Sequence, residues 1–330
     1  MKTQIGRLTR NGLGYGMALA GFLARSEKSI GSPVSIAIEP TNICNLRCPL
    51  CATGAGTLKR LKGSMKLIDF KKIIDMLPAS VTDLYLWGQG EPFMAPDFLN
   101  MIQYASRHGF RTFVSTNGHF LDDVQGIVNS GLYSLIISLD GVDKETYEFY
   151  RVRGDFERVV NGIKNVSETI KNNSRGPIIT LQYIITQKNA ADMKKFISFA
   201  DEVGADSVVF KTVQAVSIKS GELYLPDNMK LTRYRKNDKG MIETDRSWFL
   251  KNRCLRLYYS FQIDWQGNIL PCCFDKDSKY IMGNVYEDSF SNIWNSEKYR
   301  SFRNMLNKKG RILSMCKDCS EGLKRMTVHG

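Results

Sequence analysis

Residues 38–51 read IEPTNICNLRCPLC, and the interpretation of the whole chain starts from this stretch. Three cysteines, Cys44, Cys48 and Cys51, follow the apolar run Val34–Ile38 with the spacing C-x3-C-x2-C. Three thiolates from one short loop can ligate three irons of a [4Fe–4S] cluster and leave the fourth iron open for chemistry. Zinc ligation and burial as small apolar side chains are the alternatives. Zinc usually takes a fourth ligand nearby, and this loop contains no histidine.

Apolar runs alternate with helical patterns on the C-terminal side of this loop. The predicted helices include Pro96–His108, Glu157–Ile170 and Ala190–Val203, and the predicted strands are Val34–Ile38, Leu84–Trp87, Arg111–Ser115, Ser134–Leu139, Ile178–Ile185 and Ser207–Lys211. The alternation is typical of βαβ units over a parallel sheet. Six strands are too few for a closed eight-stranded barrel, so the sequence predicts an α/β fold, an open and partial (β/α)6 TIM-like barrel. Its functional end should be the C-terminal strand ends.

The pattern changes after Thr212. Residues 213–250 are polar and irregular, which predicts a linker or lid. Residues 259–265, YSFQIDW, then alternate with period two, and Gln266-Gly267-Asn268 supplies a turn, so a β-hairpin is expected. Helical sequence follows over Phe290–Leu306. We therefore predict four parts: an N-terminal helical segment (1–33), the barrel (34–215), the linker or lid (216–250) and a small α+β domain (251–330).

The cysteine loop resembles that of the radical S-adenosylmethionine (SAM) enzymes, whose hallmark is C-x3-C-x-Φ-C after the first strand of a partial barrel. The aromatic Φ position is occupied here by Leu50. Residues 88–92, GQGEP, are similar to the family's G-G-E-P segment, with Gln89 in place of a glycine. The resemblance implies that Cys44, Cys48 and Cys51 hold a SAM-binding [4Fe–4S] cluster, and that Gln89, Gly90 and Glu91 contact the methionyl amino group.

Further matches fall at the next two predicted strand ends. Ser115-Thr116-Asn117-Gly118 ends the third strand, and Ser138-Leu139-Asp140-Gly141 ends the fourth. In similar enzymes the first residue of each segment reaches the SAM ribose or carboxylate. The resemblance therefore implies SAM-binding roles for Ser115, Asn117 and Ser138, and for Arg151, or Arg153 just beyond it, as a partner of the carboxylate.

Five cysteines remain, namely Cys254, Cys272, Cys273, Cys316 and Cys319. Their arrangement around the predicted hairpin resembles the C-terminal extension of SPASM and twitch members of the same superfamily. The chain lacks the middle C-x2-C-x5-C segment of a full SPASM domain, so the twitch form with one auxiliary [4Fe–4S] cluster is the better match. Four ligands are then Cys254, Cys272, Cys316 and Cys319. Neighbouring strand residues point to opposite faces, so Cys273 is expected to be a small buried hydrophobe; zinc ligation is the alternative.

The resemblance implies that the enzyme cleaves SAM reductively to a 5′-deoxyadenosyl radical, which abstracts hydrogen from the substrate. An auxiliary cluster that accepts the substrate electron favours an oxidoreductase of the dehydrogenase type, acting on a small polar metabolite such as a sugar or cyclitol. A peptide-modifying maturase and an enzyme for a lipid-linked substrate are the alternatives. A flavodoxin- or ferredoxin-type electron donor is the expected partner. The substrate base cannot be identified from the sequence.

Charge and the N-terminus add expectations about partners. The chain has 330 residues with 46 Lys and Arg against 33 Asp and Glu, a formal charge of +13. Such a surplus favours anionic partners, but no recognition motif supports nucleic-acid binding. Lys2, Arg7 and Arg10 precede the apolar stretch Gly12–Ala24, which is too short to span a bilayer. We expect a retained helix that packs on the body or lies on an anionic membrane surface, and a cytoplasmic enzyme.

Overall fold

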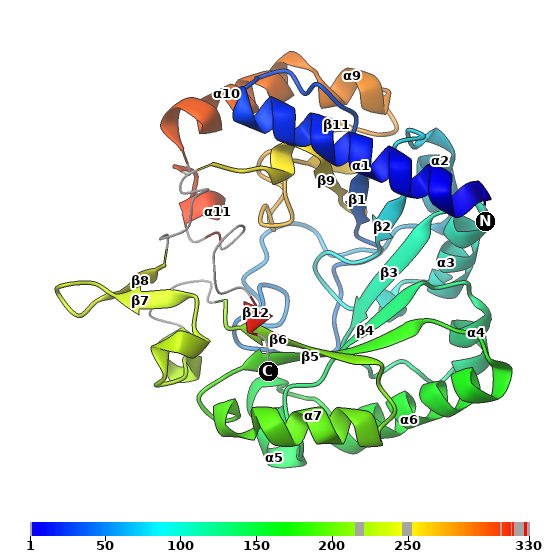
Figure 1. Ribbon diagram of the computed structural model, residues 1–330, viewed down its shortest axis with the longest axis vertical. Coiled ribbons are helices and arrows are strands. Elements are labelled where there is room, and N and C mark those ends of the chain that lie inside the picture. Colours follow the sequence, from blue (N-terminus) through cyan, green and yellow to red (C-terminus); the bar gives the residue numbers. More distant parts are fainter. Residues whose placement is uncertain are drawn as a thin grey trace. The chain divides into compact units, whose positions relative to one another are not determined.

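The computed structural model describes residues 2–214, 221–245, 253–310, 312–317, 319 and 327–328 (Figure 1). The chain divides into two compact units, each built from segments that are distant in sequence. The first unit contains Met1–Ile43, Lys59–Phe113 and Asn252–Lys317, and the second contains Cys44–Leu58, Val114–Lys251 and Asp318–Gly330. The predicted boundaries at 215/216 and 250/251 lie outside the described residues, so the partition into four parts stays a prediction.

The first unit is built on a mostly parallel sheet. Strands β9 (Ser260–Ile263), β1 (Ser35–Ile38), β2 (Asp83–Tyr85) and β3 (Arg111–Thr116) lie side by side and parallel. Strands β10 (Asn268–Leu270) and β11 (Gly283–Asn284) extend it in antiparallel fashion beyond β9. The predicted hairpin is thus confirmed as β9 and β10, and its first strand joins the sheet next to β1, with Ile36 opposite Phe261. Both side chains are buried, because this sheet is covered on its faces.

The helices of the first unit are α1 (Lys2–Leu23), α2 (Leu67–Met76), α3 (Phe98–Arg107), α9 (Phe290–Trp294), α10 (Glu297–Lys309) and α11 (Ser314–Lys317). The helical sequence predicted over Phe290–Leu306 is confirmed, and the structure divides it into the two helices α9 and α10. The side-chain oxygen of Ser296 accepts a hydrogen bond from the backbone N–H of Tyr299 and starts a new helix there. Among the described helices, none combines the length and the hydropathy of a membrane-spanning segment.

The second unit continues the strand–helix alternation. Strands β4 (Ser134–Ser138), β5 (Ile178–Ile185) and β6 (Ser207–Thr212) are parallel, and β12 (Thr327–Val328) pairs antiparallel with β6. The helices are α4 (Val124–Asn129), α5 (Lys144–Tyr150), α6 (Phe156–Asn173) and α7 (Met193–Glu202). The α/β expectation is confirmed, with the six predicted parallel strands present within about two residues of the predicted bounds.

Short elements complete both units. The 3-10 turns are η1 (Pro92–Met94), η2 (Ala190–Asp192), η3 (Glu222–Tyr224), η4 (Met229–Leu231) and η5 (Arg256–Tyr258). The expectation of irregular structure over 213–250 is wrong in part, because β7 (Tyr234–Lys236) and β8 (Ile242–Thr244) form a hairpin. Its turn is made by Asn237, whose side-chain oxygen accepts from the backbone N–H groups of Lys239 and Met241.

Candidate functional site

The predicted cluster-binding loop lies in the second unit. Cys48 is buried in an apolar cluster with Leu46 and Leu50, and Cys44 and Cys51 pack against the same cluster. Leu50, which stands at the position expected to be aromatic, is therefore part of the lining of this loop. Burial raises the pKa of the Cys48 thiol, with the neighbouring Cys51 acting in the same direction. The loop thus brings one buried and two partly buried thiols to the same apolar cluster.

Nitrogen donors point at two of these sulfur atoms. The backbone N–H of Leu46 donates to Cys44 Sγ at 3.4 Å, and the Asn117 amide nitrogen lies 3.8 Å from the same sulfur. Arg151 Nη1 lies 3.7 Å from Cys48 Sγ. Donors of this kind favour the thiolate, which is the form that ligates metal.

Arg151 is held in place by Asp140. Its Nε lies 2.5 Å from Asp140 Oδ2, and the two side chains are 11% and 0% exposed. The other Asp140 oxygen accepts from the backbone N–H of Ile184 at 2.6 Å. Burial raises the pKa of Asp140, and the Arg151 charge opposes that shift. The sequence pattern alone does not mark Asp140 as a site residue; its place directly before the turn glycine Gly141 is the available signal.

Of the other strand-end residues of the second unit, Asn117 contacts this loop directly. Asn117 is buried and also donates to Asn45 at 2.8 Å, while Ser138 ends β4 as a buried residue. Ser115 lies one residue before the end of β3 and is half-buried. The SAM contacts expected of Ser115 and Ser138 stay predictions.

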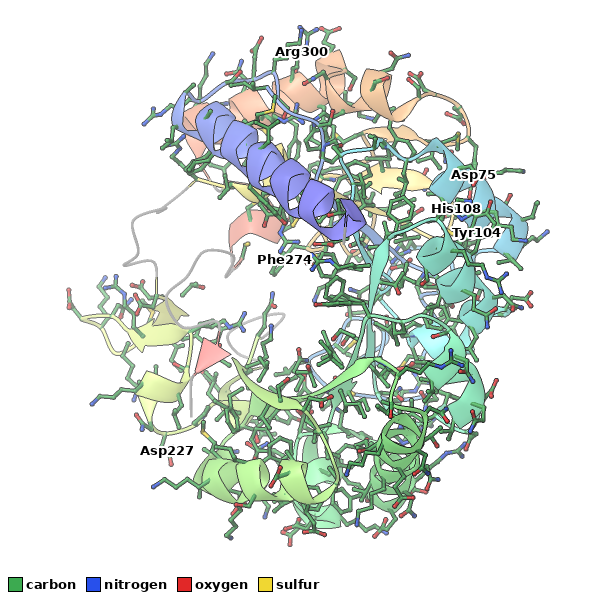
Figure 2. The ribbon with its side chains drawn as sticks, turned by 45° about the vertical axis from the view of Figure 1, so that its right-hand side comes forward. Asp75, Tyr104, His108, Asp227, Phe274 and Arg300 are labelled. Atoms are coloured by element: carbon green, nitrogen blue, oxygen red, sulfur yellow. The ribbon has the colours of Figure 1, made fainter. Side chains whose placement is uncertain are left out.

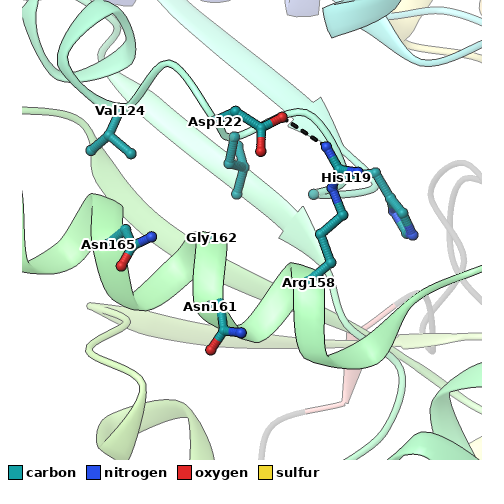
Figure 3. A pocket seen from close by; sticks show the side chains of 9 residues that line it. His119, Asp122, Val124, Arg158, Asn161, Gly162 and Asn165 are labelled. Carbon is teal, nitrogen blue, oxygen red and sulfur yellow. Dashed lines mark hydrogen bonds and ion pairs between the residues drawn. The ribbon is translucent and has the colours of Figure 1, made fainter.

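His119 has a structural partner. Its Nε2 accepts a hydrogen bond from the backbone N–H of Asp155, the N-cap of α6, at 2.9 Å. Beside it lies a cavity of about 290 Å³, lined by α4, α6 and the turn before α4 and flanked by the Asp122–Arg158 ion pair (Figure 3). The predicted cofactor residues are absent from the lining of this cavity. His108, the other described histidine, belongs to an exposed group with Tyr104 and Asp75 (Figure 2).

The Gly88–Glu91 loop lies in the first unit, after β2. Gly90 has φ +82°, and a Cβ there would meet the backbone atoms of residues 41–43 at 2.7 Å. Glu91 is buried, and its side chain accepts from the backbone N–H of Phe93 at 3.2 Å, which caps η1. The backbone N–H of Gln89 donates to Glu39 at 2.8 Å. The sequence alone does not mark Glu39 as a site residue.

Three of the five remaining cysteines gather in the first unit. Strand β10 ends at Leu270, so Cys272 and Cys273 lie in a turn (Figure 2 labels the adjoining Phe274). The expectation that the two side chains point to opposite faces assumes that both residues lie on a strand, and this assumption is wrong. A hydrogen bond with Cys273 and burial raise the pKa of the Cys272 thiol, and Cys254 contributes in the same direction. Arg256 Nη1 lies 4.0 Å from Cys273 Sγ. Which of the two ligates a cluster stays a prediction.

The last two predicted ligands lie near the C-terminus. Cys316 is half-buried on α11 in the first unit. Cys319 is buried, belongs to the second unit, and lies close enough to Arg233 to influence its pKa. The structure thus brings Cys254, Cys272 and Cys273 together, and describes Cys316 and Cys319 separately.

These donor sets fit iron–sulfur ligation. Over the segments that the structure describes, no three His, Cys, Asp or Glu side chains already form a metal-binding group. Both sets nevertheless consist of thiols, in partly buried surroundings, with cationic or amide nitrogens directed at sulfur. Thiolates in such surroundings suit iron–sulfur clusters, and hydrogen bonds to sulfur are one of the ways a protein adjusts their potential.

Comparison with known proteins identifies the family. Residues 38–200 match the model of the Radical SAM superfamily, and residues 254–320 match that of SPASM, an iron–sulfur cluster-binding domain. The chain belongs to the radical SAM superfamily and carries a C-terminal SPASM domain. Members of this family use SAM and [4Fe–4S] clusters, so both are cofactors of this chain.

Relatives of several kinds share this architecture. The chain is 26% identical over 302 residues to the mycofactocin maturase MftC of Mycobacterium tuberculosis (strain CDC 1551 / Oshkosh). The aligned region covers 86% of this chain and 75% of the relative. The chain is 24% identical over 309 residues to the AdoMet-dependent heme synthase of Methanosarcina barkeri, covering 85% and 87%. The crystal structure of Streptococcus suis SuiB bound to its precursor peptide SuiA matches with a TM-score of 0.63 and 15% identity, covering 87% and 70%. The last likeness shows the fold alone.

Proposed function

We propose that this chain is a radical SAM oxidoreductase that removes a hydrogen atom, and then a second electron and a proton, from its substrate. The observation that carries the proposal is the loop on which Cys44, Cys48 and Cys51 share one apolar cluster. These three thiolates would hold the SAM-binding cluster, which when bound supplies the electron for reductive cleavage of SAM. The apolar lining excludes water, and water would otherwise quench radical chemistry.

The proposed site residues have separate tasks. Asn117 and Arg151 direct N–H groups at Cys44 and Cys48 and so favour the thiolates. The Gly88–Glu91 loop, Ser115 and Ser138 are the proposed contacts of SAM. We assign Cys254, Cys272, Cys316 and Cys319 to an auxiliary cluster that accepts the substrate electron. A flavodoxin- or ferredoxin-type protein is the proposed electron donor, and the cytoplasm, where such donors and cluster assembly are found, is the proposed compartment.

A lipid-linked substrate stays an alternative, and two other substrate classes have specific support. The cysteine pattern of the sequence favours a small polar metabolite. The relatives favour a peptide, because MftC is named a maturase and SuiB was solved with a precursor peptide. Both classes are compatible with two-electron oxidation. Deuterium placed at the attacked carbon tests the reaction type for either class: the label should appear in 5′-deoxyadenosine, and the product should be two hydrogens poorer. Label returned to SAM would instead indicate an isomerase and contradict the oxidoreductase assignment.

The N-terminal helix supports a proposal about location. One face of α1 packs on the first unit through Ala18 and Phe22. The opposite face is apolar and exposed, with Leu13, Leu19 and Leu23 at 68%, 46% and 63% exposure. Monomeric proteins rarely leave such a face uncovered. Lys2, Arg7 and Arg10 belong to the same helix, so an anionic membrane surface is the proposed occupant.

Vesicle co-sedimentation tests this contact with full-length protein. Vesicles that contain phosphatidylglycerol should bind the chain more than phosphatidylcholine vesicles, and salt should weaken the binding. Leu19→Glu should reduce it strongly. Leu223→Glu is the matched control, because Leu223 on η3 is 62% exposed. Equal binding by the two variants would contradict the proposal, as would a dimer in solution that Leu19→Glu disrupts without any binding to vesicles.

A further inference from the structure

The buried ion pair of Glu39 and Arg60 in the first unit connects the Gly88–Glu91 loop with the turn after Cys272 and Cys273. Glu39 directly follows β1, and its side chain is 0% exposed. Arg60 is 6% exposed, and its two terminal nitrogens lie 2.6 Å and 2.5 Å from the two Glu39 oxygens. This fork-to-fork geometry fixes the relative orientation of both groups more firmly than a single contact would.

Glu39 also touches the proposed SAM loop. Its Oε2 accepts a hydrogen bond from the backbone N–H of Gln89 at 2.8 Å. A Cβ on Gly88 would lie 2.6 Å from the same oxygen and 2.7 Å from Glu39 Cβ. The loop therefore begins in direct contact with the carboxylate, and only a residue without a side chain permits that approach. Any shift of Glu39 would move the start of this loop.

Arg60 has a third partner on the other side. Its Nε donates to the backbone oxygen of Lys276 at 2.7 Å. The preceding residue, Lys59, donates its backbone N–H to Asp277 at 2.8 Å. Lys276 and Asp277 closely follow Cys272 and Cys273 in the chain. The Arg60 guanidinium thus bonds to the Glu39 carboxylate, which contacts the Gly88–Glu91 loop, and to the backbone of Lys276, which follows Cys272 and Cys273 in the chain.

Stability alone is a weak explanation for this arrangement. A buried ion pair must overcome the desolvation of both charges, and well-packed apolar residues of similar size often stabilise a protein equally well or better. The three-way bonding of Arg60 instead specifies position. It holds Glu39 so that one oxygen faces the backbone N–H of Gln89, at the first residue proposed to contact SAM.

We propose that Glu39 and Arg60 are a positioning pair, which keeps the Gly88–Glu91 loop in its SAM-binding conformation and ties it to the turn after Cys272 and Cys273. The inference rests on the proposed function, since the loop is assigned to SAM. Neither residue is proposed to touch SAM or a cluster. The pair acts through the backbone of the loop and should therefore affect the affinity for SAM and not the chemical step.

A double variant tests the pair in the anaerobically reconstituted protein. Glu39→Leu with Arg60→Met removes both charges together, which avoids leaving one of them buried and alone. The hydrogen bond from Gln89 to a carboxylate is lost, and such bonds are worth roughly 10–150-fold in an equilibrium. SAM affinity, measured by equilibrium dialysis, should therefore fall by at least about tenfold, while the iron content should match that of the wild type.

The chain offers a matched control. Asp83 and Arg111 form another two-point ion pair of the first unit, with contacts of 2.7 Å and 2.8 Å. Asp83 starts β2, at the opposite end of that strand from Gly88. The double variant Asp83→Leu with Arg111→Met should bind SAM like the wild type. Equal SAM affinity in the two double variants would overturn the positioning role.

A third variant covers the case in which the Glu39 and Arg60 double variant fails to fold. Arg60→Lys leaves a cation beside Glu39, so the buried carboxylate stays paired. A single ammonium lacks the planar fork that bonds two carboxylate oxygens and the Lys276 carbonyl together. This variant should weaken SAM binding with its iron content intact, and wild-type affinity would overturn the inference. Absence of SAM binding by the wild-type protein itself would overturn the proposed function, and this inference with it.

Discussion

Replacing Gly90 by alanine should destabilise the protein and weaken SAM binding for one structural reason. Gly90 has φ +82°, in the left-handed region, and an alanine Cβ there would lie 2.7 Å from three backbone atoms of residues 41–43. Left-handed backbone costs an alanine about 1–2 kcal/mol. The steric conflict adds about 1–3 kcal/mol, as overpacking does, because backbone cannot turn aside as a flexible side chain can.

Gly240→Ala separates these two contributions. Gly240 has φ +74° and no atom within 4 Å of a Cβ built there, so its substitution carries the backbone strain without the conflict. The steric conflict alone should therefore place the melting temperature of Gly90→Ala about 1–4 °C below that of Gly240→Ala, at roughly 1.4 °C per kcal/mol for a chain of 330 residues. SAM affinity should fall only in Gly90→Ala. Equal melting temperatures, with SAM binding intact in both variants, would refute the reasoning about this loop.

Three further predictions concern single side chains. Arg151→Leu leaves the buried Asp140 carboxylate unpaired, so the free energy of unfolding should fall by about 3–5 kcal/mol and recover largely on adding Asp140→Asn; a double variant no more stable than the single one would contradict this. Burial lowers the pKa of His119, so the fold is stabilised above the unfolded pKa of about 6.5, where His119 is neutral in both states. Between pH 7 and pH 5 the melting temperature should therefore fall more for the wild type than for His119→Gln. Parallel curves for the two proteins would contradict this. Iron analysis should show a loss in Cys272→Ala and none in Cys273→Ala, and the opposite result would assign the ligand to Cys273.

The strands were predictable because parallel sheets are built from short apolar runs. Ile178–Ile185 is observed with the predicted bounds, and the other five parallel strands differ by a residue or two at one or both ends. The hairpin at Gly267 was also predictable, since period-two alternation and a turn glycine are local signals. The interruption between α9 and α10 is not visible in the apolar pattern of the sequence. It arises because the Ser296 side chain bonds to the backbone N–H of Tyr299 and caps a new helix.

The candidate site was predictable where chemistry depends on spacing along the chain. The loop of Cys44, Cys48 and Cys51 is of this kind, because three thiolates within eight residues are near one another in any fold. Glu39 and Arg60 were missed because they are 21 residues apart and meet only through tertiary structure. The turn of Cys272 and Cys273 was misjudged because the end of β10 at Leu270 follows from register with β9, which the sequence does not display.

The central claim is that Cys44, Cys48 and Cys51 hold the cluster at which SAM is cleaved. The most direct measurement is 5′-deoxyadenosine formed from SAM by anaerobically reconstituted, reduced protein, alongside iron content. We predict about eight irons and steady 5′-deoxyadenosine formation for the wild type, and about four irons with no 5′-deoxyadenosine when the three cysteines are replaced by alanine. A triple variant that keeps its full iron content or still forms 5′-deoxyadenosine would contradict the assignment.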